Sequence, residues 1–207
     1  MKITVVGTGN MATSFVKQLT KNGHLVQIVG RNAEKSDALA KKYGAKVISP
    51  LHGSEADIII LATAYAEAVS ALRSLGNLSG KLVVDITNPV TADYKALTIG
   101  HSTSAAEEIS QAFPGVKLVK AFNTIFAQVL AEGPKLAGSN IPVFIATDDE
   151  TAKGTVSLLV NSLGFDVIDA GGLKNARYLE PLGGLNIYLG YGAGLGTSIA
   201  PSWLFVK

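Results

Sequence analysis

The feature that most constrains this fold is a glycine turn that joins an apolar strand to a helix near the N-terminus. Residues 2–6 have the apolar character of a buried strand, and residues 7–12 follow with the spacing G-x-G-x-x-A. Apolar residues then recur at Met11, Phe15 and Leu19, which predicts a helix to about residue 21. Residues 25–29 have the character of a second strand. This order predicts a phosphate-binding βαβ unit of about thirty residues.

Each small residue of the turn has a physical role in holding a dinucleotide. Gly7 permits the tight bend after the strand, and Gly9 lets the backbone approach a pyrophosphate without a Cβ in the way. Ala12 permits close packing of the helix on the strand. The helix then directs its free N–H groups and the positive end of its dipole at the phosphates. A structural turn that has lost its ligand is the alternative, but the βαβ context favours a dinucleotide site.

The end of the second strand indicates which dinucleotide binds. NAD-binding proteins usually place an acidic residue there, which accepts hydrogen bonds from the adenosine ribose and disfavours a 2′-phosphate. This chain has Gly30, Arg31 and Asn32 instead, with Lys35 one helical turn beyond. Arg31 can hold a phosphate through charge-assisted hydrogen bonds, and Lys35 adds a second positive charge. We therefore expect NADPH to bind at least about tenfold more tightly than NADH, the alternative being a solvated arginine at a helix start.

Strands and helices alternate along most of the chain, which predicts an open, mostly parallel α/β sheet of the Rossmann type with helices on both faces. Residues 57–61 form a fully apolar strand of the kind that parallel sheets bury on both faces. Further strands are expected at residues 46–48, 81–85, 117–121, 142–146 and 165–169, and further helices at about 33–43, 64–75, 104–112 and from Asp148 or Asp149 to about 164. Residues 123–140 are less regular and are expected to be partly helical.

The chain divides into an expected dinucleotide-binding domain at residues 1–180 and a short glycine-rich segment, 181–207, that packs on it. No charged residue lies between Glu180 and Lys207, but glycines and a proline interrupt this stretch, so we do not expect it to span a membrane. Two interpretations of the segment stay open. It forms a glycine-lined platform for a flat ring, or it serves close helix packing or a homodimer contact.

Four aromatic residues of this segment carry separate expectations. Tyr188 and Tyr191 lie near the platform in the first interpretation. Trp203 and Phe205 are expected to anchor the tail in an apolar groove rather than to contact substrate.

Composition excludes several kinds of site and partner. The net charge is only +2 and no basic run occurs, so nothing favours nucleic acid as a partner. The absence of cysteine excludes disulfides and thiolate metal sites and fits a reducing, cytoplasmic compartment. His24, His52 and His101 are scattered, which predicts no metal site. No Ser–His–Asp set or paired carboxylate stands out, so we assign no catalytic acid, base or nucleophile.

Two later segments lie where a bound nicotinamide should run, at the carboxyl ends of strands. Ala62 and Thr63 directly follow the apolar strand at 57–61, and Tyr65 comes two residues later. Thr87 and Asn88 are polar residues after the next strand, and Pro89 tightens and fixes that turn. Ordinary turn chemistry is the alternative for both segments.

Residues 120–124, Lys-Ala-Phe-Asn-Thr, complete a set of motifs with a known counterpart. Together with residues 7–11, 30–32, 86–89 and 163–165, they make the chain resemble the NADP reductases that depend on the deazaflavin coenzyme F420. The chain is also similar to the cytoplasmic oxidoreductase domain of the six-transmembrane epithelial antigen metalloreductases. It lacks the six-helix haem domain of those proteins, so we do not expect it to pass electrons across a membrane alone.

The resemblance implies hydride transfer between NADPH and a flavin or deazaflavin acceptor. It implies three sets of contacts with NADP, which are Thr8, Asn10 and Met11 at the pyrophosphate, Arg31, Asn32 and Lys35 at the 2′-phosphate, and Thr63, Tyr65, Asn88 and Pro89 on the nicotinamide side. Ala121 and Asn123 would lie beside the nicotinamide ring, where the second cofactor stacks. Two alternative functions are a non-catalytic NADPH-binding redox sensor and a small dehydrogenase that acts on a carbonyl or imine.

Overall fold

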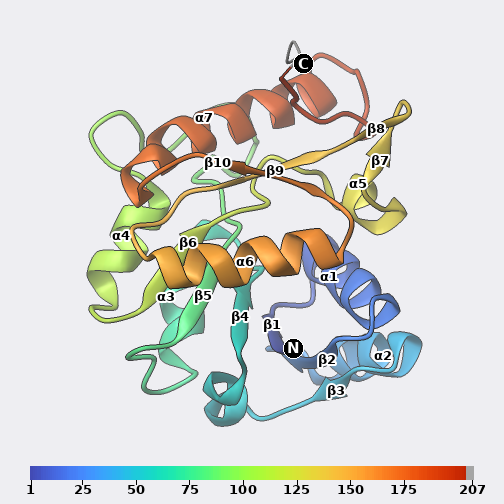
Figure 1. The fold of residues 1–207 in the computed structure, drawn as a ribbon, viewed down its shortest axis with the longest axis vertical. Helices are drawn as coiled ribbons and strands as arrows, with labels where there is room; N and C mark the ends of the chain where they lie inside the picture. Colours follow the sequence, from blue (N-terminus) through green and yellow to red (C-terminus); the bar gives the residue numbers. More distant parts are fainter. Residues whose placement is uncertain (204–207) are drawn as a thin grey trace.

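Six parallel strands form the central sheet, in the order β3-β2-β1-β4-β5-β6 (Figure 1). The structure is a computed structural model that describes residues 1–203. The strands are β1 (Lys2–Val6), β2 (Leu25–Val29), β3 (Lys46–Val47), β4 (Ile58–Leu61), β5 (Leu82–Asp85) and β6 (Lys117–Lys120). The chain builds outward from β1 to β3 and then returns to place β4 on the other side of β1. The resulting switch point between β1 and β4 is where open α/β sheets bind ligands.

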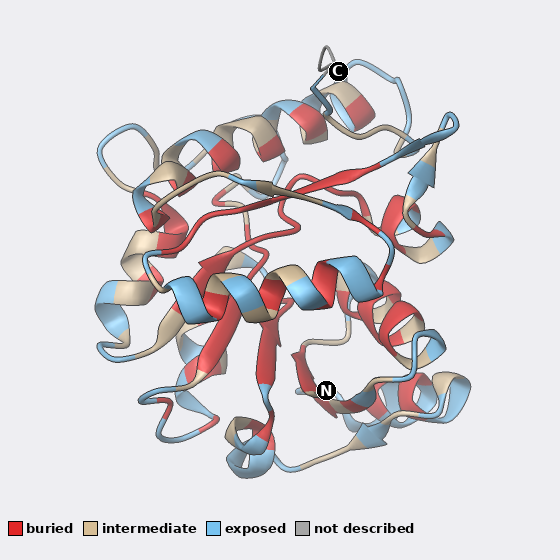
Figure 2. Ribbon diagram, in the orientation of Figure 1, coloured by how far each residue is buried: buried red, intermediate tan, exposed pale blue. Residues whose placement is uncertain are grey.

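Helices cover both faces of this sheet, as the alternation of elements predicts. They are α1 (Asn10–Lys21), α2 (Ala33–Tyr43), α3 (Tyr65–Arg73), α4 (Ala105–Ala112), α5 (Ala127–Glu132), α6 (Glu150–Ser162) and α7 (Ala176–Ile187). Ile58 and Ile60 pack in one core with residues of α1, α2, α5 and α6, whereas Ile59 and Leu61 pack in a second core with α3 and α4. The central strand β4 is thus buried between two layers of helices, which explains why it is apolar at every position (Figure 2).

A second pair of parallel strands, β9 (Pro142–Ile145) and β10 (Asp166–Asp169), continues the structure beyond β6. Lys120 at the end of β6 and Ala146 after β9 form an antiparallel bridge, with N···O distances of 2.9 and 3.0 Å. Asp149 caps α6 by accepting a hydrogen bond from the Ala152 N–H at 2.8 Å. Asp148, the other expected cap, instead accepts from the Leu173 N–H at 3.0 Å.

The region that looks irregular in the sequence, residues 123–140, contains the short helix α5 and a hairpin of β7 (Lys135–Leu136) and β8 (Ser139–Asn140). The prediction of partial helix there is confirmed, but the hairpin was not foreseen. Its strands are only two residues each, too short for a period-2 pattern to show. Two 3₁₀ helices, at Pro50–Glu55 and Leu173–Asn175, connect longer elements.

The C-terminal part begins with α7, which lies beside the β9–β10 pair (Figure 1). Leu179 of α7 packs with Phe144 and Ala146, and the helix continues without interruption across residue 180 into a π-helical turn at Tyr188–Gly192. The Trp203 ring meets the Phe144 ring edge-on at 5.2 Å between centroids, while Phe205 lies outside the described residues. Among residues 1–203, no helix has both the length and the apolar character that crossing a bilayer requires.

Candidate functional site

The glycine turn after β1 is held by contacts that only glycine permits. Gly7 has φ +127°, and a Cβ there would collide with the carbonyl oxygen of Ala62 at the end of β4. A Cβ on Gly30 would collide with Ser36 Oγ and lie 2.6 Å from Thr8 Cγ2. At Gly9, by contrast, a Cβ would meet no protein atom within 4 Å. Gly7 and Gly30 therefore allow close packing between neighbouring segments of the chain. Gly9, in contrast, faces open space.

One cavity of about 600 Å³ opens beside this turn, and we call it the Arg31 cavity. Its lining includes eight of the residues that the sequence marks as ligand contacts, namely Gly7, Thr8, Gly9, Arg31, Asn32, Lys35, Ala62 and Thr63. Its further wall comes from α3, with Glu67, Ser70 and Ala71 among the lining residues. Three separate loops at the carboxyl ends of β1, β2 and β4 thus meet at one site, as the switch-point rule predicts.

Arg31 and its neighbours give this cavity its charge. The Arg31 side chain is 86% exposed, and its Nη1 lies 2.7 Å from Glu67 Oε2. Asn32 caps α2 by accepting a hydrogen bond from the Lys35 N–H at 2.9 Å, so its side-chain oxygen is already used. Lys35 also lines this cavity. Two cations therefore face the adenosine side of the expected dinucleotide site, and one of them is engaged by an acid.

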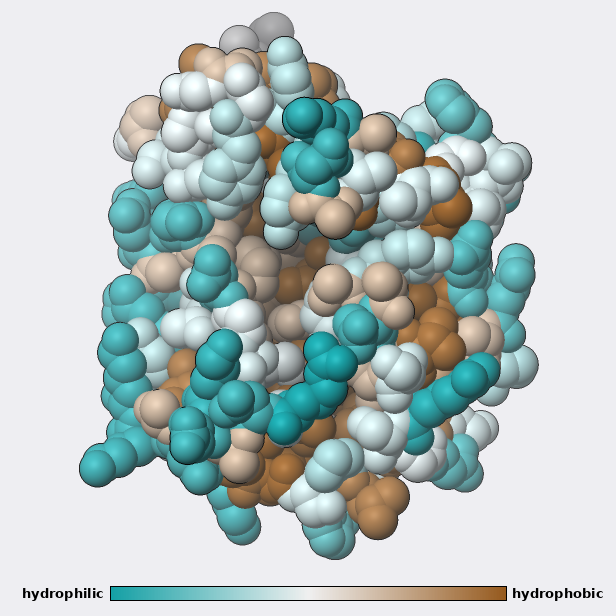
Figure 3. Space-filling model, turned by 180° about the vertical axis from the view of Figure 1, so that it is seen from behind, coloured by the Kyte–Doolittle hydropathy of each residue, from teal (hydrophilic) through white to brown (hydrophobic). Residues whose placement is uncertain are grey.

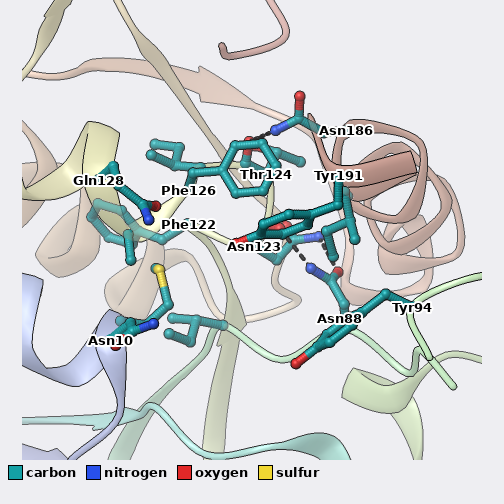
Figure 4. A pocket seen from close by; sticks show the side chains of 16 residues that line it. Asn10, Asn88, Tyr94, Phe122, Asn123, Thr124, Phe126, Gln128, Asn186 and Tyr191 are labelled. Carbon is teal, nitrogen blue, oxygen red and sulfur yellow. Dashed lines mark hydrogen bonds between the residues drawn. The ribbon is translucent and has the colours of Figure 1, made fainter. Parts of the chain in front are cut away.

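A second cavity has a volume of about 420 Å³, and we call it the Tyr191 cavity (Figure 4). Asn10 and Met11, the residues directly after Gly9, line it, so the N-terminus of α1 lies between the two cavities. Its other walls come from three regions far apart in the sequence, residues 86–94, 122–128 and 183–191. The lining residues there are Ile86, Asn88, Tyr94, Phe122, Asn123, Thr124, Ile125, Phe126, Ala127, Gln128, Gly183, Asn186, Ile187 and Tyr191.

Aromatic rings shape one end of the Tyr191 cavity. The Tyr191 ring packs edge-on against Phe126, at 5.6 Å between centroids, and lies 6.2 Å from the Tyr94 ring. Seen from the side opposite to Figure 1, the surface is hollowed near its centre, and apolar residues are visible inside the hollow (Figure 3). Of the two aromatic residues that the sequence associates with a ring platform, Tyr191 lines the cavity and Tyr188 does not.

Asn88 and Asn123 form a reciprocal pair on the wall of this cavity. Asn123 Nδ2 donates to Asn88 Oδ1 at 2.9 Å and to the Leu179 carbonyl at 2.8 Å, and Asn88 Nδ2 donates to the Asn123 carbonyl at 2.7 Å. A Cβ on Gly183 would lie 2.6 Å from Asn88 Oδ1, so α7 approaches the pair only because residue 183 is glycine. Asn123 Oδ1 is buried and has no hydrogen-bond partner within the described residues.

Behind the Asn88 turn lies a buried charge network that sequence reasoning missed. Lys120 Nζ lies 2.7 Å from Asp85 Oδ2, 2.7 Å from the Thr87 carbonyl oxygen and 2.8 Å from Glu180 Oε1. All three charged side chains are 98–100% buried. Burial raises the pKa of Glu180, and the Lys120 ammonium acts against that rise. Lys120 within the otherwise apolar run of residues 118–122 was the available signal, because a buried charge requires a partner.

Glu180 connects this network to two helices. Its carboxylate accepts hydrogen bonds from the Ala105 N–H at 2.8 Å and the Ala106 N–H at 3.1 Å, at the start of α4. It is itself a residue of α7. The network thus fixes the end of β5, the end of β6, the start of α4 and the middle of α7 around the wall of the Tyr191 cavity.

Five of the residues marked by the sequence line neither cavity, and they are Ala12, Tyr65, Thr87, Pro89 and Ala121. The Tyr65 hydroxyl donates to Glu108 Oε2, and its pKa is raised by burial and by this carboxylate. The Thr87 side chain is buried, with no partner for its Oγ1 within the described residues. Ala12 and Ala121 are buried in the core. The structure therefore does not place these five residues on the surface of the candidate site.

The histidines lie apart from both cavities. His24 Nε2 lies 2.8 Å from Ser162 Oγ just before β2, and His52 Nδ1 lies 2.8 Å from Glu55 Oε1 in the first 3₁₀ helix. His101 lies in an exposed turn with φ 56°. Within residues 1–203, no three His, Cys, Asp or Glu side chains gather in a way that would hold a metal ion.

Comparison with known proteins identifies relatives of this chain in both sequence and structure. The family model described as NADP oxidoreductase, coenzyme F420-dependent, matches residues 2–89. The F420-dependent NADP reductase of Methanothermobacter marburgensis is 30% identical over 210 residues, which cover 91% of this chain and 92% of that protein. A crystal structure of a proposed F420-dependent NADP reductase from Arthrobacter sp. FB24 superposes with a TM-score of 0.85 at 30% identity, covering 96% of both chains.

A second group of relatives matches this chain over only part of their own length. Metalloreductase STEAP3 of Rattus norvegicus is 32% identical over 182 residues, which are 87% of this chain and 36% of the rat protein. The chain therefore spans about a third of the length of the metalloreductases that it matches. The match to the Methanothermobacter reductase, in contrast, extends over nearly the whole of both proteins. On that basis the chain belongs to the family of F420-dependent NADP reductases, which are NADP-dependent oxidoreductases.

Proposed function

We propose that this chain transfers hydride between NADPH and a flavin or deazaflavin-type acceptor. The observation that carries the proposal is the arrangement of the two cavities on either side of the α1 N-terminus. The Arg31 cavity supplies cations and backbone amides suited to a phosphorylated adenosine. The Tyr191 cavity supplies an aromatic end suited to a flat ring. The names of the F420-dependent relatives support the same class of acceptor.

The residues of the Arg31 cavity fit NADP on structural grounds. Gly9 stands at the N-cap of α1, where the described residues place no side chain on the helix N–H groups. The space that a Cβ would fill at Gly9 is open to a pyrophosphate. Arg31 and Lys35 would bind the 2′-phosphate, at roughly 1.5–3 kcal/mol for each charge-assisted hydrogen bond.

The nicotinamide side would be held by the Asn88–Asn123 pair. Asn123 lines the Tyr191 cavity, and its buried Oδ1 lacks a donor among the described residues. A ligand carboxamide offers the N–H that this acceptor requires. The Lys120 network keeps the Asn88 turn in place, because Lys120 Nζ binds the Thr87 carbonyl directly before it. We infer that Asn123 orients the ring and that Asn88 orients Asn123.

The chemistry itself places few demands on side chains. NADPH supplies the hydride, and an acceptor ring receives it without an acid–base set in the protein. The protein binds both rings, holds them in line and excludes water. In this proposal, residues 181–192 complete the acceptor cavity, through Gly183, Ile187 and Tyr191. A homodimer and a cytoplasmic location stay predictions.

The proposal is tested by measuring loss of NADPH absorbance under anaerobic conditions with FMN, a deazaflavin and ferric chelates as acceptors. Turnover with a flavin or deazaflavin supports the reductase. Tight NADPH binding without oxidation by any acceptor would favour a redox sensor, and turnover only with carbonyl or imine compounds would favour a dehydrogenase.

A pair of tyrosine variants separates the two cavities. Tyr191→Leu removes an aromatic ring from the acceptor cavity, so kcat/KM for the acceptor is expected to fall while the Kd for 2′,5′-ADP, the part of NADP assigned to the Arg31 cavity, is unchanged. Tyr178→Leu is the matched control, because Tyr178 lies on α7 with an exposed ring outside both cavities. Equal loss of acceptor turnover in both variants would contradict the assignment of the Tyr191 cavity to the acceptor.

A further inference from the structure

The exposed arginine of the Arg31 cavity already has an anionic partner from another part of the chain. Glu67 Oε2 lies 2.7 Å from Arg31 Nη1, although the two residues are 36 positions apart and lie on different elements. Arg31 follows β2, and Glu67 lies in the first turn of α3. Both residues line the cavity, so the contact joins two of its walls.

The backbone of Glu67 is held by its own helix. Its N–H donates to the Ala64 carbonyl at 3.0 Å, in the turn that opens α3, and its carbonyl accepts from Ser70 Oγ at 2.9 Å. The Arg31 side chain, in contrast, is 86% exposed and rests on this carboxylate. The backbone of the acid is therefore held within reach of the guanidinium, and with the Glu67 side chain 43% exposed, the ion pair is open to a competing ligand.

We propose that Glu67 is a specificity-determining residue, which competes with the 2′-phosphate of NADP for Arg31 and so lowers the affinity for 2′-phosphorylated ligands. This inference rests on the proposed NADP site. A 2′-phosphate reaches Arg31 either by displacing Glu67 or by sharing the guanidinium with it. Displacement loses the ion pair, and sharing brings two anions together. A ligand without the phosphate leaves the pair intact, so Glu67 narrows the preference for NADPH over NADH.

The size of the effect follows from exposure. Exposed ion pairs contribute little to free energy, which corresponds to about a one- to fivefold change in an equilibrium, and repulsion between nearby anions adds to this. Replacing Glu67 is therefore expected to tighten binding of a 2′-phosphorylated ligand by about two- to tenfold. A partner of this strength tunes affinity without blocking the site.

The test uses 2′,5′-ADP and 5′-AMP as probes, which differ only in the 2′-phosphate, and measures both Kd values by calorimetry at low salt. Glu67→Gln keeps the shape of the side chain and removes its charge. We expect 2′,5′-ADP to bind about two- to tenfold more tightly to this variant than to the wild type. The Kd for 5′-AMP is expected to change by less than about twofold, because no 2′-phosphate is present.

Glu34→Gln is the matched control, since it removes the same charge from the first turn of α2, next to the site. Within the described residues Glu34 has no ion-pair partner and lines neither cavity. We expect it to change the Kd for 2′,5′-ADP by less than about twofold. Equal tightening in Glu34→Gln and Glu67→Gln would reduce the effect to general charge and overturn the proposal, as would unchanged or weaker binding by Glu67→Gln.

A double-mutant cycle locates the effect at Arg31. In an Arg31→Met background the competition for the guanidinium is absent, so adding Glu67→Gln is expected to change the 2′,5′-ADP affinity by less than about twofold. The same tightening in both backgrounds would contradict competition for Arg31. If the wild type binds 2′,5′-ADP no better than 5′-AMP, the NADP site itself fails. If it prefers 2′,5′-ADP and Glu67→Gln does not raise that preference, only the role of Glu67 fails.

Discussion

The two ends of the site use the same chemistry in opposite environments. At the adenosine end, Arg31 and Glu67 meet at 2.7 Å with the arginine 86% exposed. At the nicotinamide end, Lys120 and Asp85 meet at the same distance with both side chains fully buried. Water screens the first pair and leaves it easily exchanged for a ligand. The second pair is shielded from water, so removing one partner leaves a bare charge in the core.

This difference separates charged residues that bind a ligand from charged residues that stabilise the fold. An exposed cation can be offered to a ligand because its release costs the fold little. The buried lysine can serve only as a fixed support, because Asp85, Glu180 and the Thr87 carbonyl all depend on it. Charge variants at the adenosine end should therefore change binding without changing stability, and variants at the nicotinamide end should change stability first.

The largest effect is expected from Lys120→Met. The variant leaves Asp85 and Glu180 buried without their cation, which typically costs about 3–5 kcal/mol of unfolding free energy. Urea denaturation measures this loss. Lys117→Met is the control on the same strand, because Lys117 is partly exposed and pairs with Asp149 at 3.2 Å, so it should cost less than about 1 kcal/mol. Similar losses in both variants would contradict the structural role of the buried network.

Gly183→Ala should cost about 1–3 kcal/mol, since the new Cβ would lie 2.6 Å from Asn88 Oδ1 and push α7 away from the pair. It should also lower acceptor turnover without weakening 2′,5′-ADP binding. Gly154→Ala in α6 is the matched control, because a Cβ there meets no atom within 4 Å. That variant should stabilise the protein by about 0.5–1 kcal/mol through helix propensity. Loss of stability in both variants would remove the steric explanation.

The adenosine and nicotinamide ends of the site also differ in how much of each could be predicted from the sequence. The glycine turn, Arg31 and Lys35 were predicted, because one continuous βαβ unit carries them and its spacing is set by local geometry. The Tyr191 cavity was predicted only in part. Asn10, Met11, Asn88, Asn123 and Tyr191 were marked, but the rest of its lining was not, since the lining comes from stretches as distant as Asn10 and Tyr191. Only the packing of α7 on the sheet brings them together, and periodicity does not encode that packing.

The buried network shows the same limit in a sharper form. Lys120 in the otherwise apolar run of residues 118–122 indicates that a partner is required, and Asp85 is its neighbour in the register of β5 and β6. That register follows from the fold rather than from either strand alone. Glu180 approaches from α7, 60 residues later in the chain than Lys120, and nothing local marks it. The sequence therefore indicates that an anion is required and does not say which one.

Arg31→Met tests the adenosine end directly. We expect NADPH binding to weaken about ten- to a hundredfold, because one or more charge-assisted hydrogen bonds to the 2′-phosphate are lost. NADH binding should change far less. The free energy of unfolding should change by less than about 0.5 kcal/mol, because the side chain is exposed. Lys41→Met, an exposed lysine at the far end of α2, should leave both affinities unchanged. A large loss of stability in Arg31→Met would break the contrast between the two ends.

The smallest effect is expected at an ion pair of intermediate burial, between α4 and α7. Arg177 donates from Nε and Nη2 to the two oxygens of Glu107 at 2.8 and 2.7 Å, with the side chains 26% and 17% exposed. Hydrogen bonds from Arg177 lower the pKa of Glu107. A lowered pKa in the folded state contributes stability above the unfolded value near about 4.3 and loses it as the pH falls through the folded value.

Glu107→Gln should therefore lower the unfolding free energy by about 1 kcal/mol at neutral pH, and the gap to the wild type should close as the pH falls below about 4. Urea midpoints of both proteins across this range measure the gap. Glu132→Gln, at an exposed position that ends α5, should show no such gap at any pH. A gap for Glu107→Gln that stays constant down to pH values well below the unfolded pKa would mean that shape, not charge, joins α4 to α7. The burial of a charged side chain would then not be sufficient to rank the stability effects of the variants, from Lys120→Met to Arg31→Met.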